Sequence, residues 1–419
     1  MTDGKVVFVE GALPGEIVLA DVIRRKASYE IARSVAIHRP SSERREPRCP
    51  HFSVCGGCVT QYAQPRLQVA AKQRWLEETL SRIGGVRPDI ILPPLYGPEW
   101  GYRHRARLTV RHIAKKGGVL VGFHERRSSF VADMDSCEVL PPAISALIPE
   151  LRTMVDRLSI RDRLPQIEVA VGDEIAALVF RNLAPLTAAD EGVLKDFGDV
   201  SGAWIWLQPA GPESAHPFHP ASGPRLDYTL PEFDLRIAFL PTDFTQVNHA
   251  VNRALVSRAM KLLDPRAGER IGDMFCGLGN FALPIAVLGA EVHGVEGSRL
   301  LVQRARENAV RNGLAGRASF AVANLFTVSR ASLAEFGRLD KLLIDPPREG
   351  ALELVKALPD TGAGRIVYIS CHPASLARDA GVLVKTKGYR LSAAGIANMF
   401  PHTAHVESIA LFERPGSRI

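Results

Sequence analysis

Two residues near the C-terminus have side chains that could form and break a covalent bond. Cys371 follows an apolar segment, 365–369, and precedes His372. A thiol at the end of a strand, beside a polarising neighbour, is a candidate nucleophile, because the reactive thiolate needs exposure and stabilisation. Glu407 stands at the start of another apolar segment. On this segment alone, its carboxylate is either a general base or an ordinary charged residue at a strand end.

A glycine-containing loop in the same half of the chain could bind a nucleotide. Segment 269–275 resembles a strand and is followed by Gly277 and Gly279. A strand, glycine loop and helix point backbone amides at a polar ligand, and Glu296 could accept both ribose hydroxyls. The pattern fits a nicotinamide dinucleotide as well as S-adenosylmethionine (SAM). Asp273 favours SAM, because an acid before the loop suits a cationic amino-acid group.

Three cysteines in the N-terminal half are spaced for a metal ion or an iron–sulfur cluster. Cys49, Cys55 and Cys58 lie within ten residues, with two glycines before Cys58. Such spacing points several sulfurs at one centre. Cys137 is the predicted fourth ligand, because a cage of three thiolates is usually completed from elsewhere in the fold. No secretory signal is visible, which disfavours disulfides, but spacing alone does not decide between zinc and iron–sulfur.

The positive charge is concentrated in two windows. The chain of 419 residues has 52 Lys and Arg against 45 Asp and Glu, a net charge of +7. Windows 24–48 and 102–127 carry +5 and +7, so the rest of the chain is slightly acidic. Two such stripes predict contact with the phosphate backbone of a nucleic acid. No apolar run is long enough to cross a membrane, and we expect a cytoplasmic protein.

The apolar periodicity changes along the chain. Short strands at 5–10, 16–24 and 29–38 suggest a small barrel, and 65–83 has helical spacing. Between about 100 and 240 the pattern is mixed and rich in strands. From 241 onward, helices at 246–263, 280–288 and 298–312 alternate with strands at 269–275, 291–295, 341–344 and 365–370. This alternation predicts a parallel sheet with helices on both faces, with ligands at the carboxyl ends of the strands.

Six ordered motifs together resemble the RNA 5-methyluridine methyltransferases, and specifically their iron–sulfur-containing ribosomal RNA branch. The resemblance covers nearly the whole chain. The motifs are FTQVN (244–248), DMFCGLGNF (273–281), DPPREG (345–350), SCHP (370–373), LARD (376–379) and HTAHVE (402–407).

This resemblance implies a role for each candidate residue. Cys371 is the implied nucleophile and Glu407 the implied base. The implied ligands of a 4Fe-4S cluster are Cys49, Cys55, Cys58 and Cys137. The implied SAM contacts are Gln246, Phe275, Asn280, Glu296, Asn324 and Asp345.

The resemblance also implies an architecture in three parts. Residues 1–45 would form a small OB-like β-barrel of the TRAM type that binds RNA, although its first strand could be absent. Residues 46–240 would form a mixed α+β iron–sulfur domain. Residues 241–419 would form a Rossmann-like, class I α/β methyltransferase domain. We expect a monomer that acts on ribosomal RNA rather than transfer RNA. The competing hypotheses are a nicotinamide oxidoreductase, a non-catalytic RNA-binding protein and a zinc-stabilised binding module.

Overall fold

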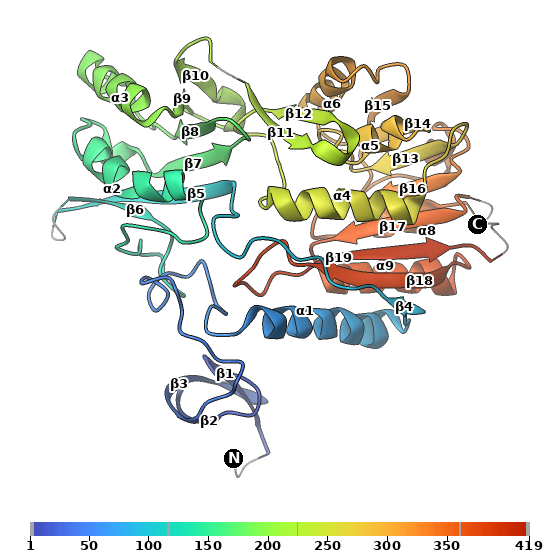
Figure 1. Cartoon of the computed structure of the whole chain (residues 1–419), viewed down its shortest axis with the longest axis horizontal. Helices are drawn as coiled ribbons and strands as arrows, with labels where there is room; N and C mark the ends of the chain where they lie inside the picture. The colour runs from blue at the N-terminus through green and yellow to red at the C-terminus, as the bar shows by residue number, and fades with distance from the viewer. Residues whose placement is uncertain (1–3, 115–117, 224, 360–361, 416–419) are drawn as a thin grey trace.

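The described residues form four sheets, one of them a two-stranded hairpin, and the helices that cover them (Figure 1). The computed structural model describes residues 4–114, 118–223, 225–359 and 362–415. Lys115 and Lys116, which belong to the second basic window, lie outside these residues.

The largest sheet has eight strands in the order β15-β14-β13-β16-β17-β19-β18-β4. The strands from β15 to β17 are parallel, whereas β19 is antiparallel to both of its neighbours. The bounds are β4 (Ile90–Ile91), β13 (Arg270–Met274), β14 (Glu291–Glu296), β15 (Ala318–Val322), β16 (Lys341–Ile344), β17 (Arg365–Ser370), β18 (Arg390–Ala397) and β19 (Glu407–Glu413). The α/β prediction is therefore confirmed for this part of the chain, with a mixed rather than purely parallel sheet.

Helices bury both faces of this sheet. One apolar core joins it to α4 (His249–Leu263), α5 (Ala282–Val287), α6 (Arg299–Arg311) and the hairpin β11 (Leu226–Leu230) and β12 (Leu235–Phe239). A second core, on the other face, includes α7 (Arg330–Ala334), α8 (Leu352–Ala357), α9 (Pro373–Lys385) and α1 (Pro65–Thr79), which continues as a π-helical turn, Leu80–Gly84. Burial of both faces explains why the central strands are almost entirely apolar.

Residues from the N-terminal half therefore complete the C-terminal sheet. Helix α1 lies along α9, where a Cβ on Gly84 would meet the carbonyl oxygen of Ala377 at 2.5 Å. Only a glycine permits this close approach of the two helices. Strand β4 then adds to β18 in parallel. Both segments lie within the range 46–240 that the sequence assigns to a central domain.

The second sheet has six strands in the order β10-β9-β8-β7-β5-β6. Its strands are β5 (Arg105–Ile113), β6 (Gly118–Gly122), β7 (Gln166–Val171), β8 (Ala176–Phe180), β9 (Trp204–Leu207) and β10 (His216–His219). Helices α2 (Pro142–Asp156) and α3 (Ala188–Ser201) share its apolar core. The start of α3 is fixed by a capping box between Thr187 and Asp190, and Gly202 ends the helix in a left-handed conformation.

The N-terminal strands form an open sheet, so the predicted β-barrel is wrong for the residues that the structure describes. Strands β1 (Val6–Glu10), β2 (Ile17–Arg25) and β3 (Tyr29–Arg39) lie in the order β1-β3-β2, with β1 parallel to β3. The three strand positions are close to those expected. Three strands are too few to curl round and pair their two edges, since even the small OB barrel uses five.

Arg44 joins this sheet to the rest of the protein. Its guanidinium donates two hydrogen bonds of 2.6 Å to Glu16 and one of 2.7 Å to the carbonyl of Gly11. The bonds from Arg44 lower the pKa of Glu16 to about 2.

Among the described residues, no helix has the length and apolar character that a bilayer span requires.

Candidate active site

A cavity of about 570 Å³ is lined by residues that follow the parallel strands of the eight-stranded sheet and by the first residue of β19. It lies at the carboxyl ends of β13, β14, β16 and β17, where open α/β sheets bind ligands. The eight residues that the sequence assigns to cofactor binding and catalysis all line it: Gln246, Phe275, Asn280, Glu296, Asn324, Asp345, Cys371 and Glu407. Segments separated by up to 161 positions thus meet at one place.

The glycine loop after β13 forms one wall of this cavity. Phe275 has a φ of +67°, and its amide donates to the carbonyl of Val295 at 2.8 Å. Gly277 has a φ of +51°, and a Cβ there would meet no atom within 4 Å. The backbone at Gly277 is therefore open to a ligand that approaches closely. Its amide donates to Glu296 at 3.2 Å, which fixes the carboxylate at the end of β14.

Asn280 is held by two other buried polar groups. Its Oδ1 accepts hydrogen bonds of 2.9 Å from the hydroxyl of Tyr228 and from Asn252 Nδ2. Its own Nδ2 donates to Asn252 Oδ1 at 3.0 Å. These partners come from the hairpin and from α4, so the hairpin helps to position a cavity residue.

Asp273 lies beneath the cavity rather than in its wall. Its side chain is fully buried, and both carboxylate oxygens lack a hydrogen-bond partner among the described residues. Burial, with the nearby carboxyls of Asp345 and Glu296, raises its pKa well above the ordinary value. The expectation that Asp273 contacts the amino-acid part of a ligand is therefore not supported by this geometry.

Cys371 occupies the turn between β17 and α9. The hydroxyl of Ser370 donates to the carbonyl of His372 at 3.1 Å, and the His372 side chain caps the helix by accepting from the amide of Ser375. This arrangement places the thiol beside the N-terminus of a helix, where the partial positive charge favours a thiolate.

Cys371 shares its surroundings with two carboxyl groups. Burial, with the charges of Glu407 and Asp345, raises the pKa of the Cys371 thiol to about 11, and the nearby Arg348 opposes this shift. Burial raises the pKa of Asp345 to about 7. Burial and Asp345 raise the pKa of Glu407 well above its ordinary value. The three groups cannot all be anions without a compensating positive charge.

The loop 345–350 is anchored by a buried carboxylate of α9. Asp379 accepts hydrogen bonds from the amide of Ala351 at 2.7 Å and from the hydroxyl of Tyr368 at 2.6 Å. Arg378 donates to the carbonyl of Glu349 at 2.8 Å. The motif at 376–379 therefore positions the loop that carries Asp345 and Arg348.

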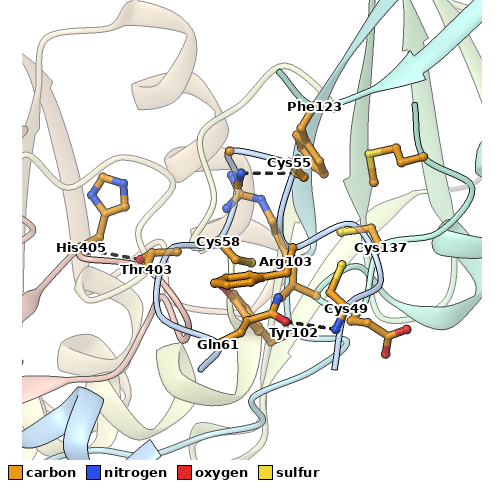
Figure 2. A pocket seen from close by; sticks show the side chains of 16 residues that line it. Cys49, Cys55, Cys58, Gln61, Tyr102, Arg103, Phe123, Cys137, Thr403 and His405 are labelled. Carbon is orange, nitrogen blue, oxygen red and sulfur yellow. Dashed lines mark hydrogen bonds between the residues drawn. The ribbon is translucent and has the colours of Figure 1, made fainter. Parts of the chain in front are cut away.

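A second cavity, of about 270 Å³, is lined by the four cysteines that the sequence singles out: Cys49, Cys55, Cys58 and Cys137 (Figure 2). None of the six cysteines, all of which lie among the described residues, forms a disulfide. Burial raises the pKa of Cys58 to about 11 and that of Cys137 to about 12. Among the described residues, no three His, Cys, Asp or Glu side chains are arranged to hold a single metal ion.

The comparisons with known proteins decide the family. Residues 232–415 match the model of the tRNA (uracil-5-)-methyltransferase family. The chain is 61% identical over 413 residues to the 23S rRNA (uracil(1939)-C(5))-methyltransferase RlmD of Aromatoleum aromaticum, covering 98% of this chain and 95% of the relative. The corresponding RlmD protein of Thiobacillus denitrificans is 62% identical, with the same coverage. This chain belongs to the RNA (uracil-C5)-methyltransferase family.

A solved structure supports the fold of this methyltransferase. The tRNA (uracil-54, C5)-methyltransferase of Pyrococcus abyssi, in complex with S-adenosyl-L-homocysteine, has a TM-score of 0.73 and 23% identity. The match covers 97% of this chain and 94% of that chain. The family shows that the protein is a SAM-dependent enzyme. The hypotheses of a nicotinamide oxidoreductase and of a protein that only binds its partner, with or without zinc, are therefore wrong.

Sequence reasoning did not single out several residues that line the cavity of this methyltransferase. Phe244, Arg348 and His405 lie within recognised motifs but have no obvious chemical signal of their own. Tyr228 and Phe326 lie outside every motif. Phe326 stacks obliquely on Phe275, with ring centres 5.6 Å apart, and only the tertiary structure could reveal that contact.

We predict that Asp345→Asn stabilises the methyltransferase at alkaline pH. The folded chain keeps the Asp345 proton up to a pKa of about 7, whereas an unfolded chain releases it near pH 4. The carboxyl group therefore favours folding at low pH, and this contribution is lost as the pH rises towards 7. Asn at position 345 does not titrate, so the variant loses this pH dependence of the free energy of unfolding. The midpoint of thermal unfolding should exceed that of the parent by several degrees at pH 8, with a smaller difference at pH 5. Equal midpoints at pH 8 would contradict the prediction.

Proposed function

We propose that this enzyme methylates carbon 5 of a uridine in 23S ribosomal RNA through a covalent adduct between Cys371 and the base. The observation that carries the proposal is the meeting of Cys371 and Glu407 in the cavity that the glycine loop walls. The curated relatives are named for this reaction at uracil 1939 of 23S rRNA, so the corresponding uridine is the proposed target. Transfer RNA is the alternative substrate, because the matching family model is described as a tRNA methyltransferase family and a structure of 23% identity is of a tRNA enzyme.

The types of residue suit the chemistry of uracil. Carbon 5 is too weak a nucleophile to accept a methyl group directly. Addition of the Cys371 thiolate to carbon 6 forms a carbon–sulfur bond and turns the ring into an enolate with electron density on carbon 5. SAM, when bound, supplies a methyl group on a positively charged sulfonium. Once carbon 5 carries that methyl group, Glu407 removes the carbon 5 proton, the carbon–sulfur bond breaks and the thiolate is restored.

The protonation states of the cavity suggest how the thiolate forms. Arg348 is the cation that lowers the pKa of Cys371, against burial and two neighbouring carboxyls. A positively charged ligand in the cavity would act in the same direction, because it offsets the crowding of negative charge. The raised pKa of Glu407 also makes its carboxylate a stronger base than one in water.

The proposed SAM contacts divide by chemistry. Glu296, at the end of β14, would accept the ribose hydroxyls. The rings of Phe275 and Phe326 would contact the adenine base. The remaining proposed contacts, at the polar wall of the cavity, are Gln246, Asn280, Asn324 and Asp345.

The four cysteines fit a 4Fe-4S cluster, which we propose they hold. All four cysteines line one cavity, and four thiolates are the usual ligands of a 4Fe-4S cluster. Arg103 also lines this cavity, and its buried Nε has no hydrogen-bond partner among the described residues. A cation there suits a cluster that four thiolates make anionic. The cluster would supply a rigid cross-link of the chain between residues 49 and 137.

We propose the following division of labour along the chain. The N-terminal sheet, as a TRAM-like module within 1–45, and the iron–sulfur part within 46–240 hold RNA, and 241–419 performs catalysis. The exposed cations of β2 and β3 support the first assignment. The target base must leave its stack to enter the cavity, as in other enzymes that modify bases. We propose that the enzyme acts as a monomer in the cytoplasm.

Replacing the nucleophile tests the covalent mechanism. We expect Cys371→Ala to lower methyl transfer by about 10³-fold or more, because no other thiol lines the cavity except the fully buried Cys276. The dissociation constant of SAM should stay within about threefold of that of the parent. The rate of methyl transfer is measured with radioactive SAM and fragments of 23S rRNA. The dissociation constant of SAM is measured by calorimetry. Turnover retained in Cys371→Ala would rule out Cys371 as the nucleophile.

Replacing the base should trap the adduct. In Glu407→Gln, addition and methylation proceed but the proton stays on carbon 5, so an RNA–protein complex should persist on a denaturing gel. Glu413→Gln is the matched control, because Glu413 ends the same strand and pairs with Arg365 at 2.9 Å. It should form no persistent adduct and keep the parental rate. Parental rates for Glu407→Gln, with no adduct, would show that Glu407 is only structural.

Metal analysis tests the cluster. Protein purified without oxygen should be brown and contain about four iron atoms per chain. Cys58→Ser should lose most of that iron, whereas Cys371→Ala should keep it, because Cys371 lines the other cavity. Stoichiometric zinc in place of iron would disprove the cluster.

A further inference from the structure

The loop between β18 and β19 carries three residues of the active cavity. Phe400 and His405 lie within the loop, and Glu407 is the first residue of β19. His405 and Thr403 also line the cysteine cavity (Figure 2). Because His405 lines both cavities, the loop contributes to both of them. The position of the proposed base therefore depends on how the backbone of 398–406 is held.

Side chains from distant segments hold the start of this loop. Lys72 of α1 is 5% exposed, and its ammonium donates to Asn398 Oδ1 at 2.9 Å and to the carbonyl of Phe400 at 2.8 Å. The hydroxyl of Tyr102 donates to the carbonyl of Pro401 at 3.0 Å. Successive carbonyl groups of the loop are thus bonded to different parts of the chain.

His402 bonds to more segments than any other residue described in this loop. Its amide donates to Gln68 Oε1 at 2.8 Å, and its carbonyl accepts from the amides of Val59 at 2.8 Å and Thr60 at 3.1 Å. Its imidazole lies 4.1 Å, centre to centre, from the ring of Trp100 and is nearly parallel to it. The side chain is fully buried.

The ring nitrogens of His402 are also satisfied. Nε2 lies 3.0 Å from the carbonyl of Glu99, which can only accept, so Nε2 carries the proton. Nδ1 then accepts from Gln68 Nε2 at 3.3 Å. Burial lowers the pKa of His402 to about 4, which keeps this neutral form at physiological pH.

The backbone of His402 is strained, which indicates that these contacts determine it. Its φ of +64° lies in the left-handed region, which is unfavourable for a residue with a Cβ. Such a conformation persists only where surrounding contacts hold it, and it occurs often at functional sites. Here the contacts come from α1, from the segment at 99–100 and from the residues that follow Cys58.

We propose that His402 is a positioning residue for the base Glu407. By joining the cysteine segment and α1 to the loop 398–406, it holds the loop in the backbone conformation that directs His405 and Glu407 into the active cavity. The proposal rests on the proposed function, because it assumes that Glu407 removes the carbon 5 proton. It also gives the cysteine segment a structural path to the active site that requires no electron transfer.

The proposal predicts a defect in one step. When His402 no longer holds the loop, Glu407 should be misplaced, while Cys371 and the glycine loop, which lie on other strands, should keep their positions. Adduct formation should therefore continue and proton removal should slow. A displacement of about 1 Å at a catalytic group can lower a rate by about a hundredfold.

Two variants remove contacts between His402 and its neighbours, one by changing His402 and the other by changing Gln68. His402→Asn keeps a residue that tolerates the left-handed conformation but loses the bond to Glu99 and the stacking on Trp100. Gln68→Met keeps the side-chain volume of Gln68 but loses both of its bonds to His402. His216→Asn is the matched control, because His216 is exposed on β10, at the edge of the second sheet.

We expect each variant to lower kcat by about tenfold to a hundredfold, with the KM for RNA and the dissociation constant of SAM within about threefold of parental values. The RNA–protein adduct should accumulate on denaturing gels, and amide hydrogen exchange in 398–406 should accelerate without RNA. The double variant should be no slower than the slower single variant, because both changes break one network. The control should match the parent throughout.

Other results would overturn the proposal. A parental kcat in both Gln68→Met and His402→Asn would contradict the proposal. A lowered kcat without accumulation of the RNA–protein adduct, or a change in KM alone, would also contradict it. If His402→Asn fails to fold, judged by circular dichroism and thermal unfolding, Gln68→Met alone decides. Failure of the proposed function is distinguishable, because the parent enzyme itself would then not methylate 23S rRNA.

Discussion

Three acidic groups share one desolvated cavity, and the rest of the site is arranged around that constraint. The Cys371 thiol and the carboxyl groups of Asp345 and Glu407 each have a pKa above the ordinary value because they are buried together. A cavity of this kind attracts positive charge. Arg348 supplies part of it from the protein, and a sulfonium ligand would supply more. A bound sulfonium ligand would therefore favour the Cys371 thiolate that the proposed mechanism requires.

The eight-stranded sheet is what brings these groups together. Its parallel strands end at one edge, and the antiparallel β19 enters the sheet from that same edge, so its first residue, Glu407, lies beside the last residues of β17. Strand reversal is thus the reason that Glu407, the proposed base, lines the same cavity as Cys371, the proposed nucleophile 36 residues earlier. The N-terminal half contributes α1 and β4 to this sheet, and the catalytic part depends on them for its second core.

The sequence predicted the site better than it predicted the packing of the parts. Cys371, Glu407 and the six proposed SAM contacts could be predicted to lie together because each follows a strand or lies in a compact motif, and the structure places all eight in the lining of one cavity. The strands expected at 269–275, 291–295, 341–344 and 365–370 lie within one residue of their observed bounds, because they are largely apolar on both faces, whereas β15 and β18 were not predicted. The open N-terminal sheet, the addition of β4 and the burial of Asp273 could not be predicted. Each depends on contacts between residues far apart in the chain, which periodicity does not record.

The two basic windows, 24–48 and 102–127, also show that the sequence predicts the presence of charged residues but not the contacts that they make in the fold. Their charge predicted a surface for nucleic acid, yet several of their arginines form ion pairs within the protein. Arg44 pairs with Glu16, Arg45 with Glu99 and Arg48 with Glu138. These pairs join the N-terminal sheet and the cysteine segment to the following parts, so part of the charge serves assembly. The exposed cations in or next to the strands of the N-terminal sheet are Lys5, Arg24, Arg25, Lys26, Arg33 and Arg39. The surface that we propose for RNA on this sheet is therefore narrower than the net charge implies, and it lies on the part of the chain that Arg44 holds in place.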